Sequence, residues 1–201
     1  FHKEQKMTES DQNTAAERWL SYREEIKVMD CTIRDGGLMN DSNFEDAVVR
    51  GVYESCVAAG IDYMEIGYIN SRDQFPVNEF GPWKHSREED IRRIVGDNDT
   101  SLKLAVMADV EKSDYKTDIL PSADSVVDMI RVATYIHQMP LALDMIKDAH
   151  DKGYESTLNL MAASTVPESE IRGALEMLVQ SEVEAIYVVD SFGSLYSEQI
   201  H

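Results

Sequence analysis

The chain has 201 residues, enough to bury one sizeable hydrophobic core, so a single domain is the default expectation. It carries 38 acidic against 19 basic residues, for a net charge of −19. This balance argues against a nucleic-acid partner, because a phosphate backbone is bound by clustered Lys and Arg. No apolar run reaches the roughly 18 to 20 residues of a membrane span, and no signal-peptide pattern is visible. We therefore expect a soluble, cytoplasmic protein without a membrane partner.

The N-terminal residues 1–25 are expected to form an arm and a helix. Residues 1–13 are polar and show no period, whereas a helical spacing of apolar side chains begins after Thr14, a plausible N-cap. This helix would either close the bottom of the following domain or pack on its outside. A chain that starts at Phe1 rather than at a methionine is compatible with a fragment of a longer protein.

A short apolar run at residues 26–29 leads directly into DCTIRDGG at residues 30–37. A buried strand is apolar inside the core and turns polar only where it leaves the core. We therefore predict a buried first strand that delivers charged side chains to an open rim. Cys31 in this segment and Cys56 have no CxxC spacing, so we interpret both as buried, reduced thiols.

Strands and helices then alternate along residues 26–201, which we assign to one domain. Further strands are predicted at residues 61–68, 102–108, 126–134, 156–162 and 185–190. Helices are predicted at 43–59 with Gly60 as C-cap, at 86–95 with Ser86 and Glu89 as a capping box, at 139–152, and after Pro167. The loop 70–84 has no period and is rich in aromatic residues and proline, so we expect it to take part in substrate selection.

Two parallel α/β architectures fit this alternation. An open doubly wound sheet calls for a glycine-rich phosphate turn such as GxGxxG, and the sequence contains none. Polar residues instead follow nearly every predicted strand, which is how a TIM (β/α)8 barrel builds its site. We therefore predict an α/β barrel of which about six βα units are present.

Four strand-end segments resemble one family: DCTIRDGG, YMEIGY, MIRVAT and VVDSFGSL. In order and spacing they are similar to the metal-dependent barrel aldolases, lyases and synthases, which include 4-hydroxy-2-oxovalerate aldolase, HMG-CoA lyase and isopropylmalate synthase. The similarity covers residues 26–200, about the N-terminal two-thirds of the family's barrel. It implies chemistry through an enolate, whose oxygen a divalent cation and an arginine can stabilise.

The resemblance also implies roles for individual residues. Arg34 would stabilise the enolate and bind substrate, and Asp35 would be a ligand of Mg²⁺ or Mn²⁺. Glu65 would be a catalytic residue that pairs with Arg34 or orients the substrate. Asn159, Asp190 and Ser191 would contact the 2-oxo acid, and Arg131 is a weaker candidate of the same kind. For each residue an ordinary structural pairing is the alternative.

The sequence departs from this family at two points. No histidine follows Arg34-Asp35-Gly36, so the catalytic base is not identified, and no His-x-His metal pair is present. The favoured hypothesis is a carbon–carbon lyase that acts next to a 2-oxo acid such as pyruvate, releasing or using an aldehyde, in a homo-oligomer. The alternatives are a synthase that condenses an acyl-CoA with a 2-oxo acid, and a catalytically silent barrel or interaction module.

Overall fold

The computed structural model describes residues 25–199, so the helix predicted after Thr14 and the C-terminal His201 lie outside the described residues. Six strands form one sheet: β1 Met29–Asp30, β2 Tyr63–Tyr68, β3 Lys103–Asp109, β4 Met129–Thr134, β5 Glu155–Leu160 and β6 Ala185–Val188. The α-helices are α2 Thr32–Gly36, α3 Asp46–Ala59, α4 Glu88–Val95, α5 Tyr115–Asp118, α6 Met139–Asp151 and α7 Glu168–Leu178. Short 3-10 turns include η2 Pro82–Lys84.

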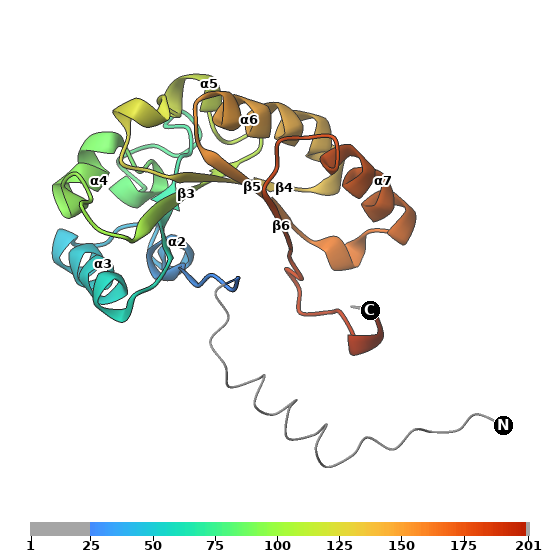
Figure 1. Cartoon of the computed structure of the whole chain (residues 1–201), viewed down its shortest axis with the longest axis horizontal. Coiled ribbons are helices and arrows are strands. Elements are labelled where there is room, and N and C mark those ends of the chain that lie inside the picture. The colour runs from blue at the N-terminus through green and yellow to red at the C-terminus, as the bar shows by residue number, and fades with distance from the viewer. Residues whose placement is uncertain (1–24, 200–201) are drawn as a thin grey trace, which may run out of the picture.

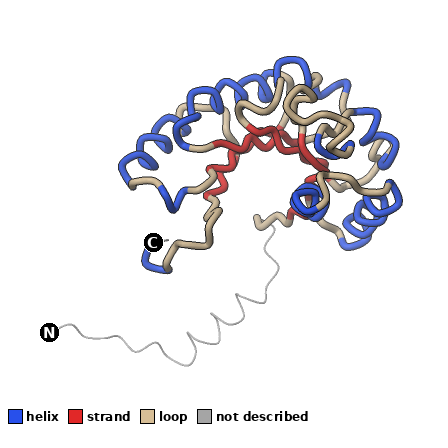
Figure 2. Tube along the Cα trace, turned by 180° about the vertical axis from the view of Figure 1, so that it is seen from behind, coloured by secondary structure: helices blue, strands red, loops and turns tan. Residues whose placement is uncertain are grey.

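All neighbouring strands pair in parallel, in the order β1-β2-β3-β4-β5-β6. A doubly wound sheet reverses its strand order part-way, whereas a barrel adds each strand beside the previous one. The sheet curls strongly, and helices α3, α4, α6 and α7 cover its convex side (Figures 1 and 2). The chain is therefore a partial TIM barrel of six strands, as predicted.

The main hydrophobic core lies between the sheet and the helices. Alternate residues of each inner strand face it, such as Leu104 and Val106 of β3, which are fully buried. Helix α6 meets them with buried residues at helical spacing: Met139, Ala142, Met145, Ile146 and Ala149. The remaining residues of each strand face the concave side of the sheet, where a small cluster of Tyr68, Met107 and Ala133 is buried.

The first strand differs from its prediction. It contains only Met29 and Asp30, both half-buried, and Ile26 and Val28 are 55% and 51% exposed. The chain then bends at once into α2, because the Asp30 carboxylate accepts hydrogen bonds from the backbone and the hydroxyl of Thr32. The segment that was predicted as a buried strand is therefore a short edge strand followed by one helical turn.

The other elements match their predictions with boundaries shifted by at most three residues. Gly60, with φ of 69°, closes α3 in the left-handed conformation that glycine adopts without strain. The predicted capping box of α4 is wrong: the N-cap is Arg87, and the hydroxyl of Ser86 donates to the carbonyl of Trp83 instead. Among residues 25–199, no helix has the length and apolar character to cross a bilayer.

Candidate active site

The concave side of the sheet holds a carboxylate between two guanidinium groups. Glu65 of β2 is fully buried, with Arg34 Nε 2.5 Å from its Oε2 and Arg131 Nη1 2.6 Å from its Oε1. A carboxylate is costly to bury unless charged partners surround it. The two cations stabilise this buried carboxylate, and the rim carboxylate of Asp35, which pairs with Arg34, brings the sum of the four charges to zero.

Arg34 lies in α2. The residue before it, Ile33, is buried in the core and anchors this helical turn. Nη1 of Arg34 donates to Asp35 at 2.8 Å, and Arg34 also interacts with the hydroxyl of Tyr68. Burial by itself would lower the pKa of Arg34, but the ion pair with Glu65 outweighs it and raises the pKa. Arg34 is therefore a permanent cation, and its side chain remains 15% exposed.

Arg131 of β4 is enclosed more completely, with a side chain that is 5% exposed. Its Nη2 donates to Oδ1 of Asn159 at 3.1 Å, and its guanidinium carbon lies 4.5 Å from the ring centroid of Tyr187. Cys31 Sγ lies 3.9 Å from Nη1. These contacts fix the orientation of Arg131. Arg131 therefore pairs with Glu65 inside the protein, whereas Arg34 remains partly accessible to solvent.

Cys31 follows β1 and is half-buried beside this charged cluster. Burial and the negative charge of Glu65 raise the pKa of the Cys31 thiol to about 11, although Arg131 and Arg34 act in the opposite direction. The thiol is therefore protonated at neutral pH. Because the thiolate is the reactive form of cysteine, Cys31 is not an activated nucleophile in this arrangement.

Asp35 lies at the rim with a side chain that is 66% exposed and paired with Arg34. Hard divalent cations are held by several oxygen ligands. The described residues contain no group of three His, Cys, Asp or Glu side chains that could hold a metal ion. The residues of this part of the chain thus do not fit a complete Mg²⁺ or Mn²⁺ site, and Asp35 can supply only one ligand.

Asp190 and Ser191 follow β6, and Asp190 bonds within its own loop whereas Ser191 bonds to the loop after β5. Asp190 Oδ2 accepts from the backbone of Leu195 at 2.8 Å, which lowers the pKa of Asp190 together with other nearby hydrogen bonds. The hydroxyl of Ser191 accepts from the backbone of Ala162 at 2.9 Å. These two residues are therefore occupied in holding strand-end loops and do not join the Glu65 cluster.

The loop 70–84 crosses the ends of β2 and β3. Its last residue, Lys84, is surrounded by three aromatic rings. Lys84 Nζ lies 4.3 Å from the ring centroid of Tyr68, 4.4 Å from that of Phe75 and 5.8 Å from that of Phe80. Phe75 and Phe80 themselves meet edge to face at 5.2 Å. Because Tyr68 also contacts Arg34, this cluster of aromatic side chains borders the charged cluster.

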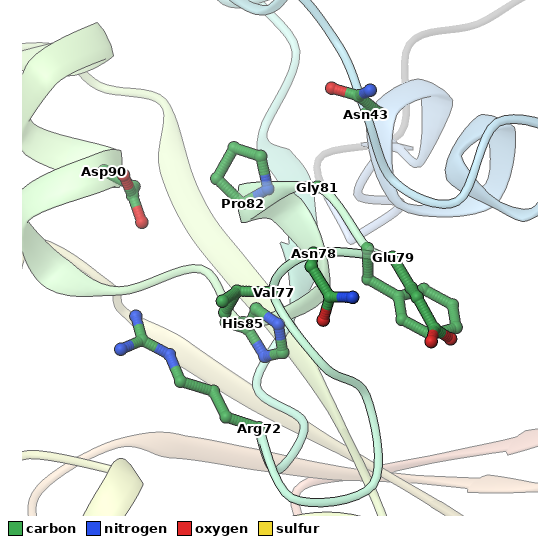
Figure 3. A pocket seen from close by; sticks show the side chains of 10 residues that line it. Asn43, Arg72, Val77, Asn78, Glu79, Gly81, Pro82, His85 and Asp90 are labelled. Carbon is green, nitrogen blue, oxygen red and sulfur yellow. The ribbon is translucent and has the colours of Figure 1, made fainter.

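The same loop also borders a surface pocket of about 360 Å³. Figure 3 shows Arg72, Val77, Asn78 and His85 gathered in this pocket, with Asp90 of α4 at its side. The His85 ring is buried, and its Nδ1 lies 2.9 Å from the carbonyl oxygen of Asn70. None of the predicted site residues lines this pocket.

The structure thus brings together Arg34, Glu65 and Asn159, the last of these through Arg131. It adds three residues that the sequence reasoning did not assign to the site: Cys31, Tyr68 and Tyr187. Along β6, the alternation of Tyr187 with Ile186 and Val188 was a usable signal, since every second residue of a barrel strand faces the interior. Tyr68 gave no such signal, because simple alternation places it with the core residues Met64 and Ile66, and the register shift between Glu65 and Gly67 turns it to the concave side.

The charged residues gather on the concave side of the parallel sheet, from the middle of β2 and β4 and from the turn after β1, so fold and site define the class of TIM-barrel proteins with a polar centre inside the barrel. No protein-family model matches the sequence. Similar curated proteins include a 4-hydroxy-2-oxovalerate aldolase of Rhodococcus opacus, 24% identical over 181 residues, which are 90% of this chain and 52% of the aldolase. An oxaloacetate decarboxylase of Mycobacterium tuberculosis is 28% identical over 182 residues, 89% of this chain and 51% of that enzyme.

Solved structures with the same fold include the N-terminal domain of a putative aldolase from Bacteroides vulgatus. It matches with a TM-score of 0.63 and 23% identity over 87% of this chain and 57% of that one. The HMG-CoA lyase of Bacillus subtilis matches with a TM-score of 0.68 and 13% identity over 89% of this chain and 62% of that one. In sequence the chain is similar to these aldolases and to the decarboxylase, and its fold is that of the HMG-CoA lyase barrel. It spans about half the length of the curated relatives that it matches.

Proposed function

We propose that this chain belongs to a carbon–carbon lyase that acts on a 2-oxo acid, with Arg34 stabilising the enolate of the product. The names of both curated relatives describe bond cleavage in a 2-oxo acid. When the bond between C3 and C4 of such an acid breaks, its electron pair passes onto the C2 oxygen as an enolate. Cleavage of 4-hydroxy-2-oxovalerate and decarboxylation of oxaloacetate therefore share one electronic requirement, a cation at that oxygen.

The two guanidinium groups that meet on the concave side of the sheet, one of them partly exposed, are the observation that carries this proposal. Arg34 and Arg131 bring two cations against one buried carboxylate in a chain whose net charge is −19. A cation in a dry, preorganised site stabilises developing negative charge far better than one in water. Since Arg34 is the more exposed of the two, it is the group that would meet the substrate, and Arg131 would hold Glu65 in place.

Asp35 would be one ligand of a divalent cation, which would supply further charge at the enolate oxygen in the complete site. The residues described here offer no second and third ligand beside it. The proposal for this chain therefore concerns its own cations, and the proton transfers at C3 and C4 are not assigned to a residue.

The test is exchange of the C3 protons of pyruvate in D₂O, followed by NMR with and without Mg²⁺. This partial reaction requires the enolate but no aldehyde. We expect the protein to accelerate exchange, and we expect Arg34→Gln to lose about 10²-fold or more of that acceleration, as for other groups that stabilise an oxyanion. Arg172→Gln is the matched control, because Arg172 is an exposed arginine of α7 that pairs only with Glu168 among the described residues. Exchange at the buffer rate, or equal exchange by the Arg34 variant, would contradict the proposal.

A further inference from the structure

The pocket of about 360 Å³ beside the loop 70–84 contains a buried histidine that no function assigned so far uses. Figure 3 shows the His85 ring between the side chains of Arg72 and Asn78. The residue is only 3% exposed, and buried polar atoms in folded proteins are nearly always hydrogen-bonded. The partners of the two ring nitrogens therefore indicate what this pocket can hold.

The hydrogen of the neutral His85 ring lies on Nδ1. This nitrogen is 2.9 Å from the carbonyl oxygen of Asn70, which can only accept, so Nδ1 donates. Burial lowers the pKa of His85, and the charges of Arg72 and Arg87 lower it further, although the contact with Asn70 and the charge of Asp118 act in the opposite direction. The ring is therefore neutral at pH 7, with a lone pair on Nε2.

Nε2 of His85 is buried and has no hydrogen-bond partner among residues 25–199. A buried acceptor without a donor is unfavourable, because it has lost its hydrogen bonds to water and gained none in return. A molecule that enters the pocket and donates a hydrogen bond to Nε2 would restore this interaction. The first requirement on a ligand is therefore a donor group.

Arg72 provides a cation in the same pocket. Within the described part of the chain, its guanidinium takes part in no ion pair or hydrogen bond. Asp90, which also lines the pocket, is already paired with Arg93 at 2.6 Å. An unpaired guanidinium suits a carboxylate, because its forked donors match the two carboxylate oxygens. The second requirement on a ligand is therefore a carboxylate.

The donor that meets Nε2 should be uncharged. Arg72 and Arg87 already place positive charge near the His85 ring, which disfavours a ligand ammonium there. A hydroxyl donates a hydrogen bond without adding charge. Val77, Phe80 and Pro82 complete the lining and can accommodate a short apolar chain.

We propose that this pocket binds a short aliphatic 2-hydroxy acid, with its carboxylate on Arg72 and its hydroxyl donating to Nε2 of His85. The hydroxyl and the carboxylate are adjacent in such an acid, as the two side chains are in the pocket. The inference does not rest on the proposed function, because neither Arg34 nor Glu65 lines this pocket.

The experiment is calorimetric titration of the protein at pH 7 with 2-hydroxybutyrate, butyrate and 2-aminobutyrate. We expect 2-hydroxybutyrate to bind at one site. Butyrate, which lacks the hydroxyl, should bind roughly tenfold more weakly, because it leaves Nε2 without a donor. 2-Aminobutyrate should also bind more weakly. Equal affinity for the three acids, or no saturable binding of 2-hydroxybutyrate, would overturn the inference.

Arg72→Gln should weaken the binding of 2-hydroxybutyrate about tenfold or more, since it removes the charged partner of the carboxylate. Arg34→Gln is the matched control, because it makes the same change in the charged cluster and should leave the affinity unchanged. Affinity that is lost in Arg34→Gln and retained in Arg72→Gln would place the ligand beside Glu65 and overturn the inference.

His85→Phe should abolish the preference for 2-hydroxybutyrate over butyrate, since phenylalanine keeps a ring but has no acceptor. His150→Phe is its control, because His150 is an exposed histidine of α6. Circular dichroism shows whether His85→Phe folds. In the native protein, the ¹⁵N resonance of His85 Nε2 should shift with 2-hydroxybutyrate and much less with butyrate, and an unchanged resonance would overturn the inference whether or not the variant folds.

Discussion

Glu65 and Arg131 form a 2.6 Å ion pair although they stand on β2 and β4, with the whole of β3 between them. Glu65 is in register with Ala105 of β3. The methyl side chain of this alanine leaves the concave side open at that level, so the long Arg131 side chain can reach across. The curl of the sheet shortens the span further (Figure 2).

Glu65→Gln is expected to destabilise the protein by about 3–5 kcal/mol, the usual cost of removing one partner of a buried ion pair. The variant leaves Arg34 and Arg131 buried together without a counter-charge. Urea unfolding followed by circular dichroism measures the change. Glu79→Gln serves as the control, because Glu79 lies exposed on the loop 70–84 and its substitution should change stability by no more than about 0.5 kcal/mol. Equal stability of the two variants would show that the buried pairs contribute little.

Gly67→Ala is expected to cost about 1–3 kcal/mol, as overpacking does in other cores. A Cβ at this position would lie 2.4 Å from the backbone oxygen of Trp83 and from the hydroxyl of Ser86. Gly67 also ends the register shift that places Tyr68 opposite Met107. The matched control is Gly51→Ala in α3, where nothing lies within 4 Å and alanine should stabilise the helix by roughly 0.5–1 kcal/mol. Thermal unfolding of both variants measures whether Gly67→Ala lowers stability and Gly51→Ala raises it.

The stability of the protein should fall at high pH because of Cys31. Its pKa is raised from 9.0 to about 11, so the folded state holds the thiol proton more tightly than the unfolded chain does. This contribution is fully present below pH 9.0 and is lost as the pH rises through about 11. The measurement is the free energy of unfolding of the native protein minus that of Cys31→Ala, under reducing conditions, across this window. A difference that stays constant would show that the thiol titrates normally.

The edge strand β6 is expected to cause self-association of a protein of these 201 residues. Ile186 and Val188 are 37% and 58% exposed, and within the described residues β6 pairs only with β5. Unpaired strand edges recruit other chains, and lysine at such an edge opposes this. Light scattering should therefore report oligomers that Val188→Lys reduces. Val179→Lys is the matched control, because it makes the same substitution at a 77% exposed position beyond α7. It should leave the oligomers intact. A monodisperse native monomer would contradict the prediction.

Much of the fold could be predicted because it depends on local patterns. Apolar runs of strand length, helical spacing and closing glycines such as Gly60 act over a few residues, so they can be read along the chain. The boundaries were less predictable. Residues 26–29 are apolar enough for a buried strand, but their position at the sheet edge leaves Ile26 and Val28 exposed. Burial is decided by neighbours that are distant in sequence.

The candidate site divides in the same way. The sequence by itself determined that Arg34, Glu65 and Asn159 follow or occupy strand ends, because side-chain alternation and the parallel architecture place them on one side of the sheet. Only the tertiary structure decided that Arg131 completes the pair with Glu65, that Asp190 and Ser191 hold loops, and that Lys84 sits among three rings. These contacts depend on register, curvature and loop path. Arg131 and Glu65 lie on different strands, and Ser191 and Ala162 lie 29 positions apart, so no local pattern encodes these contacts.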